Sequence, residues 1–109
     1  MELARVILFT NQMERMSEFY GNVLGLKQIT DEKGWREFEA GGARIALHSG
    51  APSPGRKGPK MAFYAKDVAA LREELVKRGA KLGKARQGEL FCLCDGKDPD
   101  GNPIQLSSR

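Results

Sequence analysis

Apolar and polar residues alternate along several short segments of this chain, and two longer segments carry apolar residues at helical spacing. Alternation is typical of strands with one buried face, and strands are predicted near residues 5–9, 27–30, 35–39, 44–48, 60–64, 82–84, 90–94 and 104–107. Helices are predicted over residues 12–24 and 68–78. Asn11 and Asp67 are their predicted N-caps, and Gly25 and Gly79 follow their last turns.

The order of these elements repeats along the chain. Each half contains a strand, a helix and then three strands, so the supersecondary unit βαβββ occurs twice. Residues 50–59 lie between the halves, are rich in Gly and Pro, and are typical of a linker. The length of 109 residues fits one domain. We therefore expect a single domain over residues 1–109, with a first module of about 1–50, a linker of about 50–59 and a second module of about 60–109.

Two sequence motifs resemble a known family. The first predicted helix contains Phe19-Tyr20-Gly21-Asn22-Val23-Leu24-Gly25-Leu26, and the chain ends with the turn and strand Asp98-Pro99-Asp100-Gly101-Asn102-Pro103-Ile104-Gln105-Leu106. Together with the repeat, these motifs resemble the vicinal oxygen chelate superfamily, which contains glyoxalase I, extradiol dioxygenases, and fosfomycin and bleomycin resistance proteins. The resemblance implies an α+β fold in which two βαβββ modules form an incomplete barrel of mixed sheets. It also implies a homodimer.

The positions that hold a metal in this superfamily lack metal donors in this chain. By the resemblance, they fall on Arg5, Ala46, Lys60 and Gln105, and Gln105 stands where many superfamily enzymes carry a metal-binding Glu. Divalent transition metals need imidazole, carboxylate or thiolate ligands. Arg and Lys have no lone pair to offer at neutral pH, and a glutamine amide is a weak neutral donor. We therefore predict no metal site and no cofactor.

Strand alternation sorts the side chains between a face under the helices and an opposite, concave face. The residues predicted to pack under the helices are Val6, Leu8, Phe38, Ile45, Leu47, Met61, Phe63, Ile104 and Leu106. The candidate ligand-binding residues on the concave face are Arg5, Trp35, His48, Lys60 and Gln105. Two interpretations of the cations stay open. Either Arg5 and Lys60 meet an anionic ligand, or Arg5 pairs with Glu37 or Glu39 and Lys60 lies in solvent at a strand end.

The single histidine of the chain, His48, ends a predicted strand. A histidine titrates near neutral pH and can act as a general base, so His48 and Glu37 are the candidate catalytic residues. The alternative is that His48 is a solvated side chain at the tip of its strand.

Three functions are consistent with these residues. The first is a metal-free protein that binds an anionic or aromatic small molecule in the concave cavity. The second is a superfamily enzyme, a glyoxalase-type lyase or isomerase or a dioxygenase, which uses an unrecognised metal site or acid–base chemistry of His48 and Glu37. The third is an interaction module whose concave face is filled by side chains or by a partner. Fold alone does not choose among them.

Composition narrows the expected partners and location. The formal net charge is +4, and the basic residues are scattered without interleaved aromatic residues, so a nucleic-acid surface is not expected. There is no apolar run of about 18 residues and no signal-peptide pattern at the N-terminus. We therefore expect no membrane association and a cytoplasmic location. Cys92 and Cys94 share one strand face and are predicted to be small buried residues.

Overall fold

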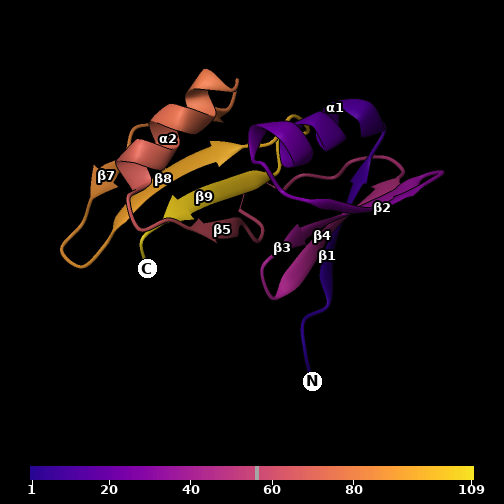
Figure 1. The fold of residues 1–109 in the computed structure, drawn as a ribbon, viewed down its shortest axis with the longest axis horizontal. Coiled ribbons are helices and arrows are strands. Elements are labelled where there is room, and N and C mark those ends of the chain that lie inside the picture. The colour runs from indigo at the N-terminus through magenta and orange to yellow at the C-terminus, as the bar shows by residue number, and fades with distance from the viewer. Residues whose placement is uncertain (56) are drawn as a thin grey trace. The chain divides into compact units, whose positions relative to one another are not determined.

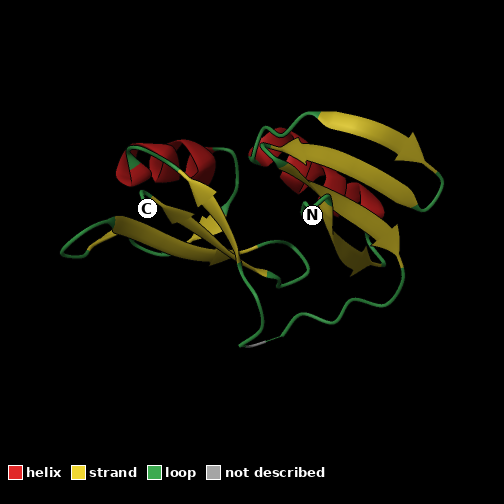
Figure 2. Cartoon of the chain, turned by 90° about the horizontal axis from the view of Figure 1, so that it is seen from below, coloured by secondary structure: helices red, strands yellow, loops and turns green. Residues whose placement is uncertain are grey.

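Two compact units make up the chain in its computed structural model, which describes residues 1–55 and 57–109. The first module is Met1–Ser53 and the second is Pro54–Arg109. Residue 56, in the predicted linker, lies outside the described residues. Each module contains one helical segment that lies against one face of its own mixed sheet (Figures 1 and 2).

The first module follows the predicted order of elements. They are β1 (Arg5–Thr10), α1 (Met13–Glu18), a π-helical turn η1 (Phe19–Val23), β2 (Gln28–Glu32), β3 (Trp35–Ala40) and β4 (Ala43–Ser49). The strands lie in the order β1-β4-β3-β2. Strand β1 is parallel to β4, and the other pairs are antiparallel.

The second module has the same plan with one additional strand. Its elements are β5 (Met61–Tyr64), α2 (Val68–Lys77), β6 (Lys81–Leu82), β7 (Arg86–Gln87), β8 (Cys92–Lys97) and β9 (Pro103–Ser107). The strands lie in the order β5-β9-β8-β6, and β7 also pairs with β8. The predicted α+β fold with two βαβββ modules of mixed sheets is confirmed. Strand β7 was not predicted, and the strand expected at 90–94 instead starts at Cys92, while Leu90 is fully exposed.

Each module buries an apolar core between its helix and its sheet. Met16, Tyr20, Phe38 and Leu47 are fully buried in the first module. The corresponding core of the second module consists of Val68, Leu75, Cys94, Ile104 and Leu106. The predicted alternation therefore holds for the central strands. No helix in the described part of the chain is long and apolar enough to span a membrane.

The helix ends agree with the sequence only in part. Asp67 caps α2 as predicted, because its side chain accepts the backbone N–H of Ala70 at 3.0 Å. The prediction of Asn11 as the cap of α1 is wrong. Gln12 occupies the N-cap position, and its backbone N–H donates to the hydroxyl of Thr10 at 3.0 Å. An Asn or Asp before a helix is a common N-cap. Here the hydroxyl of the fully buried Thr10, rather than the side chain of Asn11, accepts the backbone N–H of Gln12.

The turn before β9 is held by one buried carboxylate. Asp98 is 5% exposed and accepts the backbone N–H groups of Asp100 and Asn102, each at 2.9 Å. Gly101 has a φ of 91°, which glycine adopts without steric cost. The motif that carried the family resemblance is thus a rigid turn that sets where β9 begins.

Candidate functional site

Glu37 is the centre of a charged cluster on the face of the first sheet opposite α1. Its Oε1 accepts a hydrogen bond from Arg5 Nε at 2.8 Å, and its Oε2 accepts one from the Thr30 hydroxyl at 3.1 Å. Arg44 Nη1 lies 3.8 Å from the same Oε1. The Glu37 side chain is 8% exposed, whereas those of Arg5 and Arg44 are 39% and 47% exposed. A nearly buried carboxylate is therefore covered by two cations that reach solvent.

This environment keeps Glu37 ionised. The hydrogen bond from Arg5 lowers the pKa of Glu37, burial opposes that shift, and hydrogen bonds from Trp35 and Thr30 lower the pKa further. A carboxylate that is stabilised in this way is a weak base and is not protonated at neutral pH. Arg5 therefore pairs through its Nε with Glu37 rather than with Glu39.

Three aromatic rings lie beside one another further along the same face. Phe9, His48 and Trp35 are register partners on β1, β4 and β3. The His48 ring centroid is 5.1 Å from that of Phe9 and 5.5 Å from that of Trp35. Phe9 is 50% exposed. We call these three residues the aromatic row. The rings of Phe9 and His48 are tilted by 41° and those of Trp35 and His48 meet edge to face at 88°, so the row is a partly exposed, uneven aromatic surface beside the Glu37 cluster.

Asp95 is the centre of the corresponding cluster in the second module. Lys60 Nζ lies 3.0 Å from its Oδ1, Gln105 Nε2 donates to the same atom at 2.9 Å, and Arg86 Nη2 lies 2.8 Å from Oδ2. These contacts lower the pKa of Asp95, with the Gln105 hydrogen bond as the largest cause. The Asp95 side chain is 41% exposed, so the carboxylate of this cluster is more accessible to solvent than Glu37.

The strand registers show that the two carboxylates occupy equivalent positions. Glu37 on β3 lies opposite Ala46, and Asp95 on β8 lies opposite Gln105. Val6 pairs with Ile45 just as Met61 pairs with Ile104, so Arg5 and Lys60 are equivalent as well. Each module therefore presents one carboxylate and two cations opposite its helix.

The structure groups the predicted site residues by module. Arg5, Trp35, His48 and Glu37 share one face of the first sheet, and Lys60 and Gln105 meet at one carboxylate of the second. Sequence reasoning missed Asp95, which belongs to the second group. The expected strand stopped at Cys94, whereas β8 continues to Lys97. Because buried and exposed positions alternate, the buried Cys94 places Asp95 on the opposite face once the strand is continued.

The described residues at the superfamily's metal positions do not fit a divalent cation. The guanidinium of Arg5 and the ammonium of Lys60 each engage a carboxylate of their own module. Ala46 offers no donor, and the Gln105 amide is bonded to Asp95. Nowhere in residues 1–55 and 57–109 do three His, Cys, Asp or Glu side chains gather in a way that could hold a metal ion.

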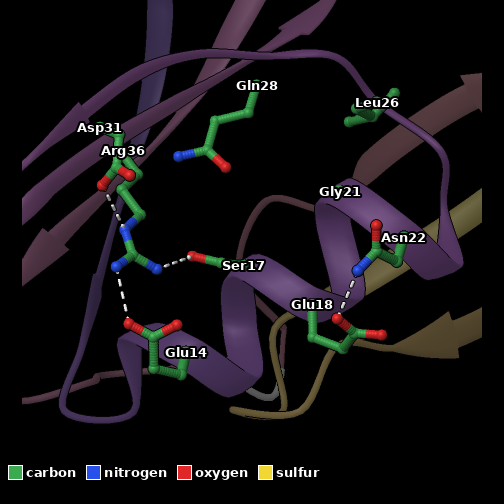
Figure 3. Close-up of a pocket in the computed structure, with 9 residues that line it drawn as sticks. All are labelled: Glu14, Ser17, Glu18, Gly21, Asn22, Leu26, Gln28, Asp31 and Arg36. Atoms are coloured by element: carbon green, nitrogen blue, oxygen red, sulfur yellow. Dashed lines mark hydrogen bonds and ion pairs between the residues drawn. The ribbon is translucent and has the colours of Figure 1, made fainter.

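A separate cleft of about 380 Å³ lies on the helix side of the first module (Figure 3). Arg36 reaches from β3 to its centre and donates to Glu14 at 2.6 Å, to Ser17 at 2.9 Å and to Asp31 at 3.1 Å. Asp31 belongs to β2, whereas Glu14 and Ser17 belong to α1. The guanidinium thus ties the helix to the sheet, and all three of its nitrogens donate to groups of the same module.

The comparisons with known proteins agree with this fold. A family model described as the Glyoxalase/Bleomycin resistance protein/Dioxygenase superfamily matches residues 2–106, whereas no curated protein matches the chain. The chain is similar to the structure of lactoylglutathione lyase from Agrobacterium tumefaciens, with 18% identity, 96% and 91% coverage of the two chains and a TM-score of 0.76.

Two further structures are similar over nearly the whole chain. One is an antibiotic binding protein from a Streptomyces species, with 19% identity, 97% and 93% coverage and a TM-score of 0.82. The other is a glyoxalase/bleomycin resistance protein/dioxygenase from Nocardioides, with 19% identity, 98% and 82% coverage and a TM-score of 0.80. At these identities the likeness shows the fold.

Proposed function

Because the chain belongs to the glyoxalase/bleomycin resistance protein/dioxygenase superfamily, we propose that it is a metal-free member that binds an anionic or aromatic small molecule. The observation that carries this proposal is the aromatic row of Phe9, His48 and Trp35 next to the Glu37 cluster. Aromatic walls with a few convergent polar groups are typical of small-molecule sites. One protein of similar fold is an antibiotic binding protein and another is a lactoylglutathione lyase, so the fold itself does not choose between binding and catalysis.

Charge supports the anionic part of the proposal. The Glu37 cluster contains two cations and one carboxylate, and the Asp95 cluster has the same composition. Each cluster therefore has a net charge of +1, which favours an anion over a cation. Arg5, Trp35 and His48 are the proposed binding residues of the first module, and Lys60 and Gln105 those of the second.

The alternative is a superfamily enzyme that uses His48 as a general base. The His48 Nδ1 lies 2.8 Å from the carbonyl oxygen of Ser49, and a carbonyl only accepts, so Nδ1 carries the proton. In the neutral ring Nε2 then keeps its lone pair. Glu37 contributes little as a proton acceptor because its pKa is lowered. His48 alone is the residue on which this alternative rests.

We also propose a homodimer that works in the cytoplasm. Each sheet has edge strands, and covering such edges removes unpaired backbone groups from water. Sedimentation of the protein at micromolar concentration tests the dimer, and a particle near the chain mass of 12.0 kDa would contradict it.

Binding is tested by a thermal-shift screen of flat aromatic metabolites against the unmodified protein. A ligand that binds only the folded state raises the melting temperature by mass action. Hits are then titrated against the fluorescence of Trp35, which is the only tryptophan of the chain. We expect the hits to change this fluorescence because Trp35 is part of the aromatic row.

The matched variants are Phe9→Ala and Leu90→Ala, which both truncate an exposed apolar side chain. We expect Phe9→Ala to weaken each hit about tenfold or more, and Leu90→Ala to leave its affinity unchanged. If the two variants bind the hits equally well, the aromatic row is not the site. Turnover of a hit that is lost in His48→Ala would instead favour the enzyme.

A further inference from the structure

The two arginines beside Glu37 are engaged to different degrees. Arg5 donates a short hydrogen bond to Glu37 at 2.8 Å. Arg44 approaches the same oxygen at 3.8 Å, and its side chain makes no hydrogen bond within residues 1–55 and 57–109. Arg5 is therefore committed to a nearly buried carboxylate, whereas the guanidinium donors of Arg44 remain available.

An opening of about 380 Å³ adjoins Arg44 at the end of the first sheet. Arg5 and Glu39 also line it, together with Gly41 and Gly42 of the turn between β3 and β4. A Cβ added to either glycine would meet no atom within 4 Å. The turn therefore leaves space in front of the half-exposed Arg44 side chain.

The surrounding charges restrict what this opening accepts. Arg5, Arg44 and Glu37 together have a charge of +1. Glu39 lies opposite Arg44 in the strand register and is exposed, and Glu2 lines the same opening. With these two carboxylates the five groups sum to −1, so the guanidinium of Arg44, rather than the net charge, is what attracts an anion here. A second negative charge on the ligand would be repelled, so a monoanion fits better than a phosphate with two charges.

The aromatic row lies at a fixed distance from Arg44. Arg44 and His48 are four residues apart on β4, so both side chains point to the same face. Four residues of strand span about 13 Å, and the long arginine side chain can shorten that distance. The acidic end of a ligand must therefore stand well away from the ring that contacts the aromatic row.

We propose that Arg44 determines ligand specificity and that the ligand is an elongated aromatic monoanion, such as an aryl carboxylate. Its rings lie on the aromatic row, and its carboxylate accepts hydrogen bonds from Arg44 in the opening beside Gly41 and Gly42. The planar guanidinium matches a carboxylate with two parallel hydrogen bonds. This inference rests on the proposed function and names the ligand class for the same site.

The test titrates Trp35 fluorescence with biphenyl-4-carboxylate and with its neutral isostere, biphenyl-4-carboxamide. We expect the acid to bind more tightly than the amide. We expect Arg44→Gln to weaken the acid about ten- to hundredfold, the range for losing a hydrogen bond to a charged group, and to leave the amide unchanged. Arg15→Gln, an exposed arginine on α1, removes the same charge elsewhere and should change neither affinity.

Each outcome decides between the two proposals. If the acid and the amide bind equally, the specificity proposal is overturned and the aromatic binding site stands. If Arg15→Gln weakens the acid as much as Arg44→Gln does, the effect is long-range charge and Arg44 is not the contact. If neither probe affects Trp35, the elongated-monoanion proposal is overturned, whereas the proposed function is decided by the thermal-shift screen and the Phe9→Ala comparison. Circular dichroism of Arg44→Gln shows whether the variant is folded. Binding by Arg44→Lys, which keeps the charge, shows whether the planar guanidinium itself is needed.

Discussion

The two modules share one register but use it differently on the face opposite the helix. The first places Phe9, His48 and Trp35 in the positions where the second has Tyr64, Ser107 and Leu93. It also buries its carboxylate almost completely, whereas Asp95 is 41% exposed. A repeated backbone thus carries three neighbouring rings in one module, and a single ring with a more exposed carboxylate in the other. The surface opposite the helix can therefore differ between modules without any change of fold.

The helix side differs as well. Phe38 pairs with Ile45, and Gly96 pairs with Ile104, so a fully buried ring and a glycine occupy equivalent positions. Strand β6 explains the glycine. A Cβ added to Gly96 would contact Leu82 Cδ2 and would lie 2.8 Å from the backbone oxygen of Lys81. The first module fills this space with a ring, and the second fills it with the backbone of a neighbouring strand.

The largest expected effect on stability comes from replacing Phe38 and Gly96 with alanine. Phe38→Ala should lower the free energy of unfolding by about 3–5 kcal/mol because it leaves a cavity. Gly96→Ala should lower it by about 1–3 kcal/mol because it overpacks against β6. Urea unfolding monitored by circular dichroism measures both midpoints. A Gly96→Ala protein as stable as the parent would show that β6 is not held against β8.

A smaller loss of stability is expected from removing Arg5 or Lys60, which occupy equivalent positions in the two modules, and the loss should differ between them. Arg5→Ala leaves the nearly buried Glu37 without its short hydrogen bond and should cost about 1–3 kcal/mol. Lys60→Ala should cost less than about 1 kcal/mol, because Asp95 is partly exposed and keeps Arg86 and Gln105. The same urea experiment measures both. The double variant Arg5→Ala/Glu37→Gln should recover part of the loss, and equal costs for Arg5→Ala and Lys60→Ala would contradict the difference in burial.

Acid sensitivity should follow from the lowered pKa values of Glu37 and Asp95. A carboxyl group whose pKa is lowered by folding stabilises the folded state above its ordinary pKa of about 4. That contribution is lost as the pH falls from about 4 through the lowered folded value. Unfolding midpoints between pH 7 and pH 3 should therefore decrease less steeply for Glu37→Gln and Asp95→Asn than for the parent. Parallel curves for all three proteins would refute this assignment.

The smallest expected effect is on metal binding. Gln105→Glu creates the carboxylate that many superfamily enzymes have, but Lys60 and Arg86 already neutralise the adjoining Asp95. The parent and the variant should therefore both stay free of stoichiometric metal after dialysis against Zn²⁺ or Ni²⁺. Elemental analysis of protein purified without a His-tag measures this, and tight uptake by either protein would overturn the argument.

The sequence by itself determined the order of the helices and of every strand except β7, and the side-chain faces of the central strands. Both helices lie close to their predicted ranges, and Phe38, Ile45 and Ile104 are buried as expected. These features depend on the spacing of apolar residues over a few positions, which can be seen in the sequence itself. The ends of both helices are also encoded locally, because Gly25 and Gly79 follow them with φ values of 76° and 104°.

Tertiary structure alone decided which side chains meet across the strands. The choice of Glu37 over Glu39 as the partner of Arg5, the place of Asp95 between Lys60 and Gln105, and the cap of α1 were open or wrong in the sequence. Each depends on strand register and on distances between residues far apart in the chain. A shift of one residue in register turns every side chain to the other face, and only the packed core fixes that register.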